Sequence, residues 1–519
     1  DGSGNKPFVG DVLIEGKKLK KIAKSIDQED AMVIDCSNLS ISPGFIDAHS
    51  HNDFFVDESI QADSIWPFIK QGITTQIVGN CGFSAYGSSR ESSFKDEIGG
   101  GLFSVKNPLP LADFKKQVKD KLLINLVPLI GHGTLRIDVA GKGAKALNEE
   151  AFAKLLQLTE AAMKQGAFGG SLGLMYQPGM FAPTEELIAF SRIIKQYDGI
   201  LTVHPRANSA VALGYPLLGK PHLVQGLDEV FAIVQKTNVQ LEYSHLIFVG
   251  KRSWKCVDRM LKAFDDMENK GYDVGYDLYP FTYGASVITV VLPSWYLKLS
   301  EKERKQTFNR FKLKCIINIT KKLLGIDFSD MLISYIGEDY PEYEGKTVDL
   351  IAKELNIKPF DAYLHLVDLS KGQGRIMLGS YYNDQIIEKL MRDKRSIYMT
   401  DAWYEPKGTQ NGGTYQAFPL FIEKSKQANI DLEHTIHKMT YATSQRFKIE
   451  KRGLLKEGYF ADITIFDEKK IKVDKTGPIK TPEGIDYVFI NGELMIKKGQ
   501  TQDKYPGIVL EKQLISENK

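Results

Sequence analysis

Short apolar runs alternate with longer amphipathic stretches through the middle of this chain. Nine of the runs are typical of strands, because each is nearly continuous in apolar character and is bounded by turn residues or by a helical pattern. They are 45–49, 73–79, 122–132, 169–174, 200–204, 240–245, 272–280, 375–380 and 396–401. The amphipathic stretches between them include 149–166 and 183–199, the second of which begins with a proline and ends with a glycine, as helices prefer. This alternation predicts repeated βα units and a parallel sheet.

An eight-stranded (β/α)8 barrel needs one strand fewer than the nine candidates. We therefore expect one of the two runs between 272 and 380 to lie outside the barrel, although the pattern does not say which. Residues 286 to about 370 break the alternation with a charged helical run at 300–324 and a Tyr/Glu/Pro-rich tail. We interpret this segment as an insertion or a lid over the barrel mouth, and a plain structural excursion is the alternative.

The pattern of apolar runs and turn residues at both ends of the chain differs from that of the middle. Short apolar runs separated by turn residues, typical of a small β domain, fill residues 1–43 and recur in 451–519. We expect the two ends to complete one β-sandwich, with the barrel at 44–450 inserted between them. A chain of 519 residues exceeds the size at which one hydrophobic core stops growing, which agrees with two domains.

Composition and charge narrow the class of protein. The formal net charge of +2 provides no large basic field for nucleic acid, and no apolar run is long enough to cross a bilayer. Four cysteines far apart do not indicate a disulfide framework, so a cytoplasmic location is the default expectation. The chain begins at Asp1 without a methionine, which leaves open whether an N-terminal segment precedes it. We expect a small-molecule substrate, and homo-oligomer formation stays open.

The sharpest chemical feature is the pair His49 and His51 at the end of the first run. Residues two apart on a strand project to the same face, so both imidazoles can point into the barrel. Barrel enzymes place their active sites at the carboxyl ends of the strands. Taken alone, this His-x-His pair is equally consistent with two ordinary loop histidines.

Further ligand-type residues end later strands in the same way. His204, His245 and Asp401 end the runs at 200–204, 240–245 and 396–401, and Cys81 follows the run at 73–79 in the turn 79–82. A mixed set of histidine, cysteine and carboxylate suits zinc better than magnesium or calcium. The sequence therefore predicts a zinc site at the barrel mouth. His132 stays ambiguous, and the other four histidines lie in ordinary helical or loop contexts.

With these motifs in place, the chain resembles the amidohydrolase superfamily and, within it, the N-acyl-D-amino-acid deacylases (D-aminoacylases). The resemblance runs nearly end to end, and the motifs that carry it are PGFIDAHSHND, QGITTQIVGNCGFS, LIGHGTLR, GAFGGSLGLMYQPG, DLYPFTY, the strands ending at His204, His245 and Asp401, and RGLLKEGYFADITIFD. It implies a (β/α)8 barrel of the amidohydrolase type with the small β-sandwich formed by both termini.

The resemblance also assigns roles to single residues. It implies a tightly bound zinc ion on Cys81, His204 and His245 and a second, weaker metal position on His49, His51 and Asp401. The expected reaction is attack of a metal-activated hydroxide on an amide carbonyl, with Asp401 as the catalytic proton shuttle. Tyr176, Tyr279 and Arg206 match positions expected to bind substrate.

Three residues depart from the family pattern where it contacts substrate. Asn208 replaces a glutamate, Ile247 replaces a lysine expected to meet a substrate carboxylate, and Ala402 replaces a glycine. Lys251 or Arg252 can stand in for the missing lysine only if their loop folds back. We therefore expect the metal site to be kept, whereas the support for a carboxylate on the substrate is weakened.

Three functions remain in competition at this point. The first is deacylation of an N-acyl-D-amino acid or a related linear amide. The second is hydrolysis of a cyclic amide, as in dihydropyrimidinases and hydantoinases, although the run at 169–174 has no lysine that could be carboxylated. The third is a metal-free scaffold on the same fold, which predicts decayed metal ligands, whereas all six candidates are present.

Overall fold

Eight parallel strands form the barrel that the sequence predicts. The computed structural model of the chain describes residues 1–56, 60–99, 103, 105, 108–212, 219–297, 299–473 and 481–513. The strands are hydrogen-bonded in the order β14-β10-β9-β8-β7-β6-β5-β4. Their bounds are β4 Phe45–Asp47, β5 Ile73–Val78, β6 Asn125–Gly131, β7 Gly169–Gly173, β8 Ile200–His204, β9 Gln240–Tyr243, β10 Val274–Leu278 and β14 Ser396–Tyr398.

The barrel closes between its first and last strands. The backbone N–H of Ala48 donates to the carbonyl of Tyr398, and that of Asp401 donates to the carbonyl of His49 at 3.0 Å. A parallel bridge between Ser50 and Ala402 continues the pairing. The segments after β4 and β14 are therefore neighbours, although they lie more than 340 residues apart in the sequence.

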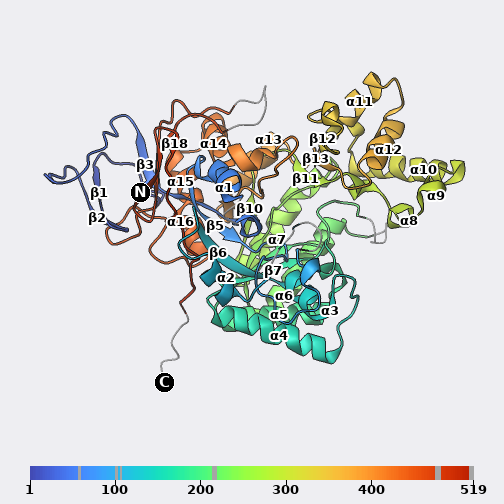
Figure 1. Cartoon of the computed structure of the whole chain (residues 1–519), viewed down its shortest axis with the longest axis horizontal. Helices are drawn as coiled ribbons and strands as arrows, with labels where there is room; N and C mark the ends of the chain where they lie inside the picture. The colour runs from blue at the N-terminus through green and yellow to red at the C-terminus, as the bar shows by residue number, and fades with distance from the viewer. Residues whose placement is uncertain are drawn as a thin grey trace.

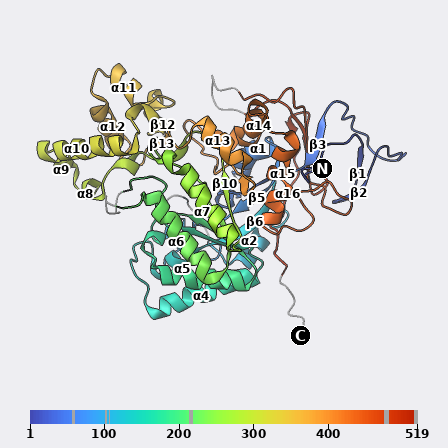
Figure 2. The ribbon, with the colours of Figure 1, turned by 180° about the vertical axis from the view of Figure 1, so that it is seen from behind.

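Helices cover the outside of the barrel, which explains why the strands are apolar throughout instead of alternating. Every residue of β5, β6, β7, β8 and β10 is buried, as expected for a parallel sheet whose two faces are both covered. In Figure 2 the helices α4 to α7 lie along the outside of the strands. The covering helices are α1 Gln61–Ile69, α2 Leu111–Gln117, α3 His132–Ala140, α4 Glu149–Lys164, α5 Thr184–Gln196, α6 His222–Thr237, α7 Val257–Asn269, α13 Asp384–Arg392, α14 Gly412–Gln427, α15 Leu432–Met439 and α16 Tyr441–Arg446.

The ninth strand candidate lies outside the barrel. The run at 272–280 supplies β10, whereas the run at 375–380 supplies β13, the central strand of a separate antiparallel sheet with order β11-β13-β12. This sheet and its helices form the insertion, seen in yellow and yellow-green at the upper right of Figure 1. The bounds are β11 Gly284–Val287, α8 Ser294–Leu297, α9 Glu301–Arg304, α10 Thr307–Leu324, β12 Met331–Tyr335, α11 Val348–Glu354, α12 Pro359–Leu369 and β13 Arg375–Leu378. A lid function for it stays a prediction.

Strands from both ends of the chain share one antiparallel sheet, with order β18-β17-β16-β15-β3. The N-terminal strands lie beside the C-terminal part at the left of Figure 1. Leu19 packs in a small core of its own with Ile463, Tyr487 and other residues of the C-terminal strands. The bounds are β1 Asp11–Glu15, β2 Lys18–Ala23, β3 Ser40–Pro43, β15 Ile463–Phe466, β16 Ile485–Ile490, β17 Glu493–Lys497 and β18 Gln500–Thr501. We keep the domain boundaries at 43/44 and 450/451 as a proposal.

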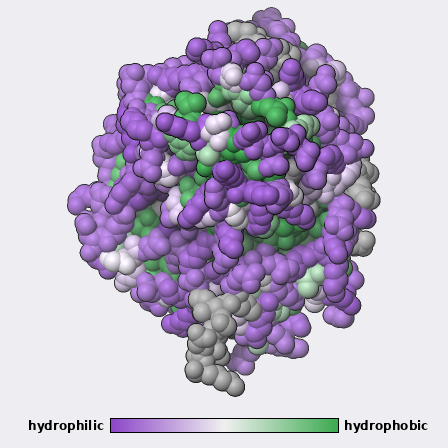
Figure 3. Space-filling view, turned by 90° about the vertical axis from the view of Figure 1, so that its left-hand side faces the viewer, coloured by the Kyte–Doolittle hydropathy of each residue, from purple (hydrophilic) through white to green (hydrophobic). Residues whose placement is uncertain are grey.

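The outer surface of this end of the molecule is mostly hydrophilic, with hydrophobic side chains gathered in patches (Figure 3). Within the ranges given above, none of the helices has both the length and the apolar character that are needed to cross a bilayer.

A buried polar network ties the small domain to the barrel. The guanidinium of Arg452 forms an ion pair with Asp462 and donates to Asn491 Oδ1 at 2.7 Å. The side-chain amide of Asn491 in turn donates to Asn125 Oδ1, on barrel strand β6, at 2.8 Å. Arg452 is only 1% exposed. Removing its charge would leave the Asp462 carboxylate buried without its cation.

We expect Arg452→Met to lower the free energy of unfolding by about 3–5 kcal/mol, because breaking a buried ion pair leaves an uncompensated charge. The measurement is urea unfolding followed by circular dichroism. Arg90→Met is the matched control, since Arg90 pairs with Asp113 at the surface, and there we expect no resolvable change. Equal effects of the two substitutions would contradict the role given to the network.

Candidate metal centre

Six side chains from five different strand ends meet at the barrel mouth. The structure brings together all six of the ligand candidates that the sequence indicates: His49, His51, Cys81, His204, His245 and Asp401. Their donor atoms fall into three overlapping groups, and within each group the atoms lie within 4.8 Å of one another. Five of these side chains are buried, and the carboxylate of Asp401 is 24% exposed. The arrangement is that of a metal-binding site.

The first group consists of one sulfur and two nitrogens. Cys81 Sγ lies 3.6 Å from His204 Nδ1 and 3.6 Å from His245 Nε2, and the two nitrogens are 2.8 Å apart. Around a tetrahedral zinc ion with ordinary bond lengths, such donors stand about 3.6 Å apart for sulfur and nitrogen and about 3.3 Å apart for two nitrogens. The sulfur distances match these values, and the two rings would separate by about half an ångström to admit the ion.

The second group is built around the carboxylate. Asp401 Oδ1 lies 3.5 Å from His49 Nε2 and 3.6 Å from His51 Nε2. The same His49 nitrogen lies 3.3 Å from Cys81 Sγ. The thiol of Cys81 therefore lies between the two groups, where a thiolate could contact an ion in either position.

Burial favours the neutral form of His49, His204 and His245. It lowers the pKa of His49 to about 3 and lowers the pKa values of His204 and His245 as well. A neutral imidazole has a lone pair to offer a metal. Burial also raises the pKa of the Cys81 thiol, which the nearby Asp401 and Asp277 raise further; metal coordination deprotonates such a thiol.

Asp401 is the one strongly acidic group of the cluster. Burial alone would raise the pKa of its carboxyl, but the hydrogen bond from His51 and the electrostatic interaction with the nearby imidazoles of His49 and His245 stabilise the anion and hold that pKa well below its usual range. The carboxylate is therefore ionised at neutral pH and can accept a proton from a nearby water.

Three of the six ligand candidates have an unusual backbone conformation. Cys81, His245 and Asp401 have φ angles of 51°, 36° and 46°. Residues other than glycine rarely adopt this left-handed region, and where they do the surrounding structure must hold them there, most often at functional sites. Each of these residues turns its side chain toward the cluster directly after a strand ends.

Strand β7 holds the turn that carries Cys81. Ser171 Oγ donates to the carbonyl of Gly79 at 2.5 Å and accepts from the N–H of Gly82 at 3.0 Å. A Cβ atom on Gly173 would lie 1.9 Å from the carbonyl oxygen of Cys81, so the turn can approach this strand only at a glycine. Sequence reasoning treated this strand only as lacking a lysine and missed its supporting role.

Two buried carboxylates behind the ligands were also missed. Asp277, on β10, lies 3.3 Å from His49 Nδ1 and accepts the backbone N–H of His245. Asp47, at the end of β4, accepts from the N–H and hydroxyl of Thr400 at 2.9 and 2.7 Å. Carboxylates that bind the second nitrogen of a metal-ligating histidine fix its orientation and tautomer. The sequence feature that could have indicated these two residues is an acidic residue inside an otherwise apolar strand run.

The predicted substrate-binding residues have different surroundings. The hydroxyl of Tyr176 lies 3.4 Å from His204 Nδ1, and Tyr279 is buried nearby against Tyr382 at 5.7 Å between ring centroids. Arg206 is instead engaged with Glu229 at 2.9 Å, and it also donates to the carbonyls of Met180 and Ala182. The guanidinium of Arg206 is therefore not free to bind a substrate in this structure. A substrate-binding role for Tyr176, Tyr279 or Arg206 stays a prediction.

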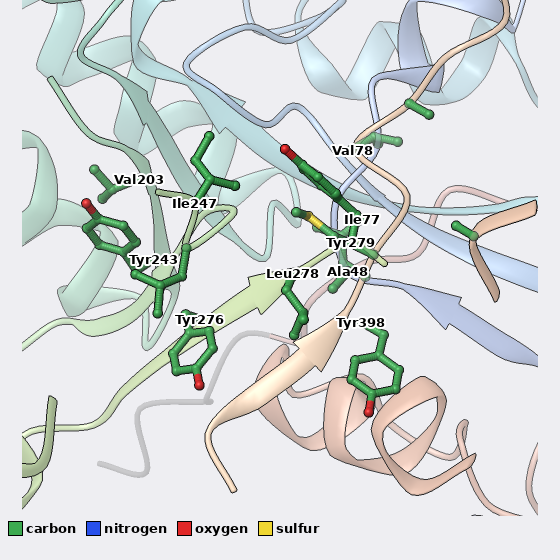
Figure 4. Close-up of a cluster of buried hydrophobic side chains, with 14 of the residues drawn as sticks. Ala48, Ile77, Val78, Val203, Tyr243, Ile247, Tyr276, Leu278, Tyr279 and Tyr398 are labelled. Carbon is green, nitrogen blue, oxygen red and sulfur yellow. The ribbon is translucent and has the colours of Figure 1, made fainter. Parts of the chain in front are cut away.

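The positions that depart from the family pattern surround the ligands. The side-chain amide of Asn208 lies 3.4 Å from His204 Nε2, where it can fix the ring. Ile247 is buried within the apolar cluster drawn in Figure 4. Beyond Ala402, the ring of Trp403 lies 5.5 Å from that of His51 and 5.2 Å from that of Phe103. Lys251 and Arg252 are exposed.

The chain has full-length relatives among proteins of named activity. No protein-family model matches it. An N-acyl-D-aspartate deacylase and a D-aminoacylase, both of Alcaligenes xylosoxydans xylosoxydans, are each 25% identical to it over 98% of this chain and 93% and 95% of their own lengths. The similarity thus includes both terminal segments and the whole barrel.

Solved structures agree in fold. The N-acyl-D-glutamate deacylase of Bordetella bronchiseptica, determined with zinc and a phosphonate that mimics the tetrahedral intermediate, superposes with a TM-score of 0.76 at 22% identity, covering 98% of this chain and 97% of that one. The dihydropyrimidinase of Brevibacillus agri NCHU1002 superposes less well, with a TM-score of 0.57 at 13% identity over 99% and 97% of the two chains.

The resemblance noted in the sequence is thereby confirmed. The fold, the end-to-end sequence relatives and the strand-end cluster agree: over nearly its whole length the chain is similar to the N-acyl-D-aspartate deacylase and the D-aminoacylase, and its fold is that of the solved N-acyl-D-glutamate deacylase.

Proposed function

We propose that this protein is a zinc-dependent hydrolase of a linear amide bond, which removes the acyl group from an N-acyl-D-amino acid or a closely related N-acyl compound. The observation that carries the proposal is the triad of Cys81, His204 and His245 at zinc-ligand spacing, with the ionised Asp401 facing it. The activities of the two sequence relatives point to the same reaction.

The donor set fits zinc. Cys81, His204 and His245 would hold the tightly bound ion, and His49, His51 and Asp401, whose carboxylate lies within 3.6 Å of both imidazoles, would form a weaker second position. Thiolate and imidazole are the ligands that zinc prefers, and three protein ligands leave a position open for chemistry. In the described part of the chain, His51 Nδ1 and His245 Nδ1 have no hydrogen-bond partner.

The residues of the site can carry out hydrolysis around such an ion. When bound, a zinc ion lowers the pKa of water and polarises an amide carbonyl. Asp401, which is ionised and partly exposed, accepts the proton of the attacking water and delivers it to the amide nitrogen. An amine is a poor leaving group until it is protonated, so this transfer permits the C–N bond to break. The hydroxyl of Tyr176 is placed to donate a hydrogen bond beside His204.

Cyclic amides are the weaker alternative. Strand β7 offers Ser171 and glycines, with no lysine to carboxylate, and Cys81 occupies the place between the two ligand groups. The scaffold alternative is disfavoured as well, because all six ligand candidates are present and converge.

The zinc assignment predicts that the purified protein contains at least one equivalent of zinc. Cys81→Ser should lose this metal, because a hydroxyl is a far poorer ligand for zinc than a thiolate. The measurement is inductively coupled plasma mass spectrometry after dialysis, with Cys256→Ser as the control, since Cys256 lies outside the cluster. Wild-type protein that neither contains zinc nor takes it up would refute the metal-dependent function.

The choice between linear and cyclic amides predicts the outcome of a substrate screen. Acetate or formate release from N-acetyl and N-formyl derivatives of D- and L-amino acids, and of their uncharged analogues, is compared with ring opening of hydantoin and dihydrouracil. We expect turnover of linear compounds, by analogy with the relatives. Turnover of the cyclic compounds alone would assign the enzyme to the other branch.

The role of Asp401 predicts that Asp401→Asn lowers kcat by about 10²- to 10⁴-fold, the usual contribution of a general acid–base. The triad that holds the tight ion is unchanged in this variant, so zinc content should stay near one equivalent. Glu405→Gln is the control, because Glu405 follows the same strand and pairs with Arg375 outside the cluster. An Asp401→Asn enzyme of wild-type kcat would rule out the proton shuttle.

A further inference from the structure

In five of the loops that follow barrel strands, those after β4, β7, β8, β9 and β14, the described lysines and arginines are paired with acids or face solvent. The loops after β4 and β7 contain no lysine or arginine in their described parts. After β8, Arg206 is held by Glu229 at 2.9 Å and Lys220 by Asp228 at 2.8 Å. Neither is therefore free to meet a negatively charged substrate.

The loops after β9 and β14 show the same pattern. After β9, Lys251 and Arg252 are both exposed. After β14, Lys407 forms an ion pair with Glu338. In the described parts of these five loops, every lysine and arginine is thus paired with an acid or exposed on the outside.

An apolar residue follows the ligand candidate His245 closely in the sequence. Ile247 follows the ligand candidate His245 by two residues and is 6% exposed. Figure 4 shows its side chain in a buried cluster, and the hydroxyl of Tyr279 points away from those of Tyr276 and Tyr398. A lysine at 247 would have its ammonium in the same buried cluster.

Uncharged donors and rings surround the cluster instead of cations. The hydroxyls of Tyr279, Tyr381 and Tyr382 stay protonated, because burial raises their pKa values and the negative charge of Asp401 adds to the effect. The hydroxyl of Tyr382 is buried and, among the described residues, has no hydrogen-bond partner. It is therefore available to donate to a neutral acceptor.

Aromatic rings form the wall beside His51. Phe103 stacks on Phe54 at 4.4 Å and on His51 at 5.1 Å between centroids, and Trp403 meets Phe103 edge-on at 5.2 Å. Phe103 and Trp403 are half-buried, so part of each ring remains accessible. Such a wall favours an apolar group on the substrate.

We propose, building on the deacylase function above, that the substrate carries no free carboxylate next to the scissile amide: its amine part is uncharged, either a simple amine or an amino acid whose carboxyl is itself in amide linkage. A carboxylate there would be brought beside the acids Asp401 and Asp277, and none of the described lysines or arginines of the five loops is free to pair with it. A charge that loses its water without gaining a partner is strongly disfavoured. A neutral carboxamide accepts hydrogen bonds from tyrosine hydroxyls without that penalty.

A matched pair of substrates tests this proposal directly. N-acetyl-D-phenylalanine and N-acetyl-D-phenylalaninamide differ only in the charge at the carboxyl, and acetate release from each is measured with zinc-loaded wild-type enzyme. We expect kcat/KM to be at least tenfold higher for the carboxamide, and the L pair reports the stereochemistry. A free acid cleaved as fast or faster would overturn the inference and leave the deacylase function standing. Failure to cleave any linear amide, including those in the screen above, would overturn both.

Position 247 supplies a second test. Ile247→Lys should shift the ratio of kcat/KM values toward the free acid by at least tenfold, because it adds the missing cation. Ile247→Met is the matched control and should keep the wild-type preference, since it preserves size and neutrality. Thermal unfolding and zinc content show whether each variant is folded. If Ile247→Lys does not fold, the comparison of the two substrates with the wild-type enzyme decides on the proposal. If the Ile247→Lys enzyme is folded and zinc-loaded and its ratio of kcat/KM values is unchanged, residue 247 does not determine whether the enzyme accepts a charged substrate.

Discussion

Packing four imidazoles, a thiol and a carboxylate together with little access to water is costly, and much of the barrel mouth serves to make that packing tolerable. Buried polar atoms must find partners, and buried charges must be balanced. The carboxylate of Asp277 contacts the ring nitrogen Nδ1 of His49 and accepts the backbone N–H of His245. This one side chain therefore positions ligand candidates from two strand ends. Asp47 similarly joins the end of β4 to the strand that precedes Asp401.

The ligand candidates could be predicted from the sequence because of where parallel strands end. In a barrel of parallel strands all carboxyl ends lie on one side, so polar residues that terminate separate apolar runs must converge. His204, His245 and Asp401 stood out on this ground, far apart in the chain, and the structure places them together.

The supporting residues could not be predicted in the same way. Ser171 and Gly173 matter because the turn at 79–82 approaches them from about 90 residues away, and nothing local in the run Gly-Gly-Ser-Leu-Gly at 169–173 indicates that contact. The ninth strand candidate was ambiguous for a related reason. Its apolar run is as suitable for an antiparallel sheet as for a barrel, and only the pairing with β11 and β12 decides between them. Asp277 could have been predicted from the sequence, since an acidic residue inside an apolar run is unusual.

The pairing of β3 with β15 has a consequence for how the chain is made. Ser40–Pro43 finds its partner strand some 420 residues later, at Ile463–Phe466. At ordinary rates of synthesis of about 5–20 residues per second, the N-terminal strand waits roughly 20 to 80 s on the ribosome before its partner exists. Only Gly44 separates β3 from β4, the strand that leads to His49. The first element of the barrel is thus anchored at its amino end only when translation is almost complete, and during that interval its apolar surface depends on chaperones or on early barrel contacts for protection.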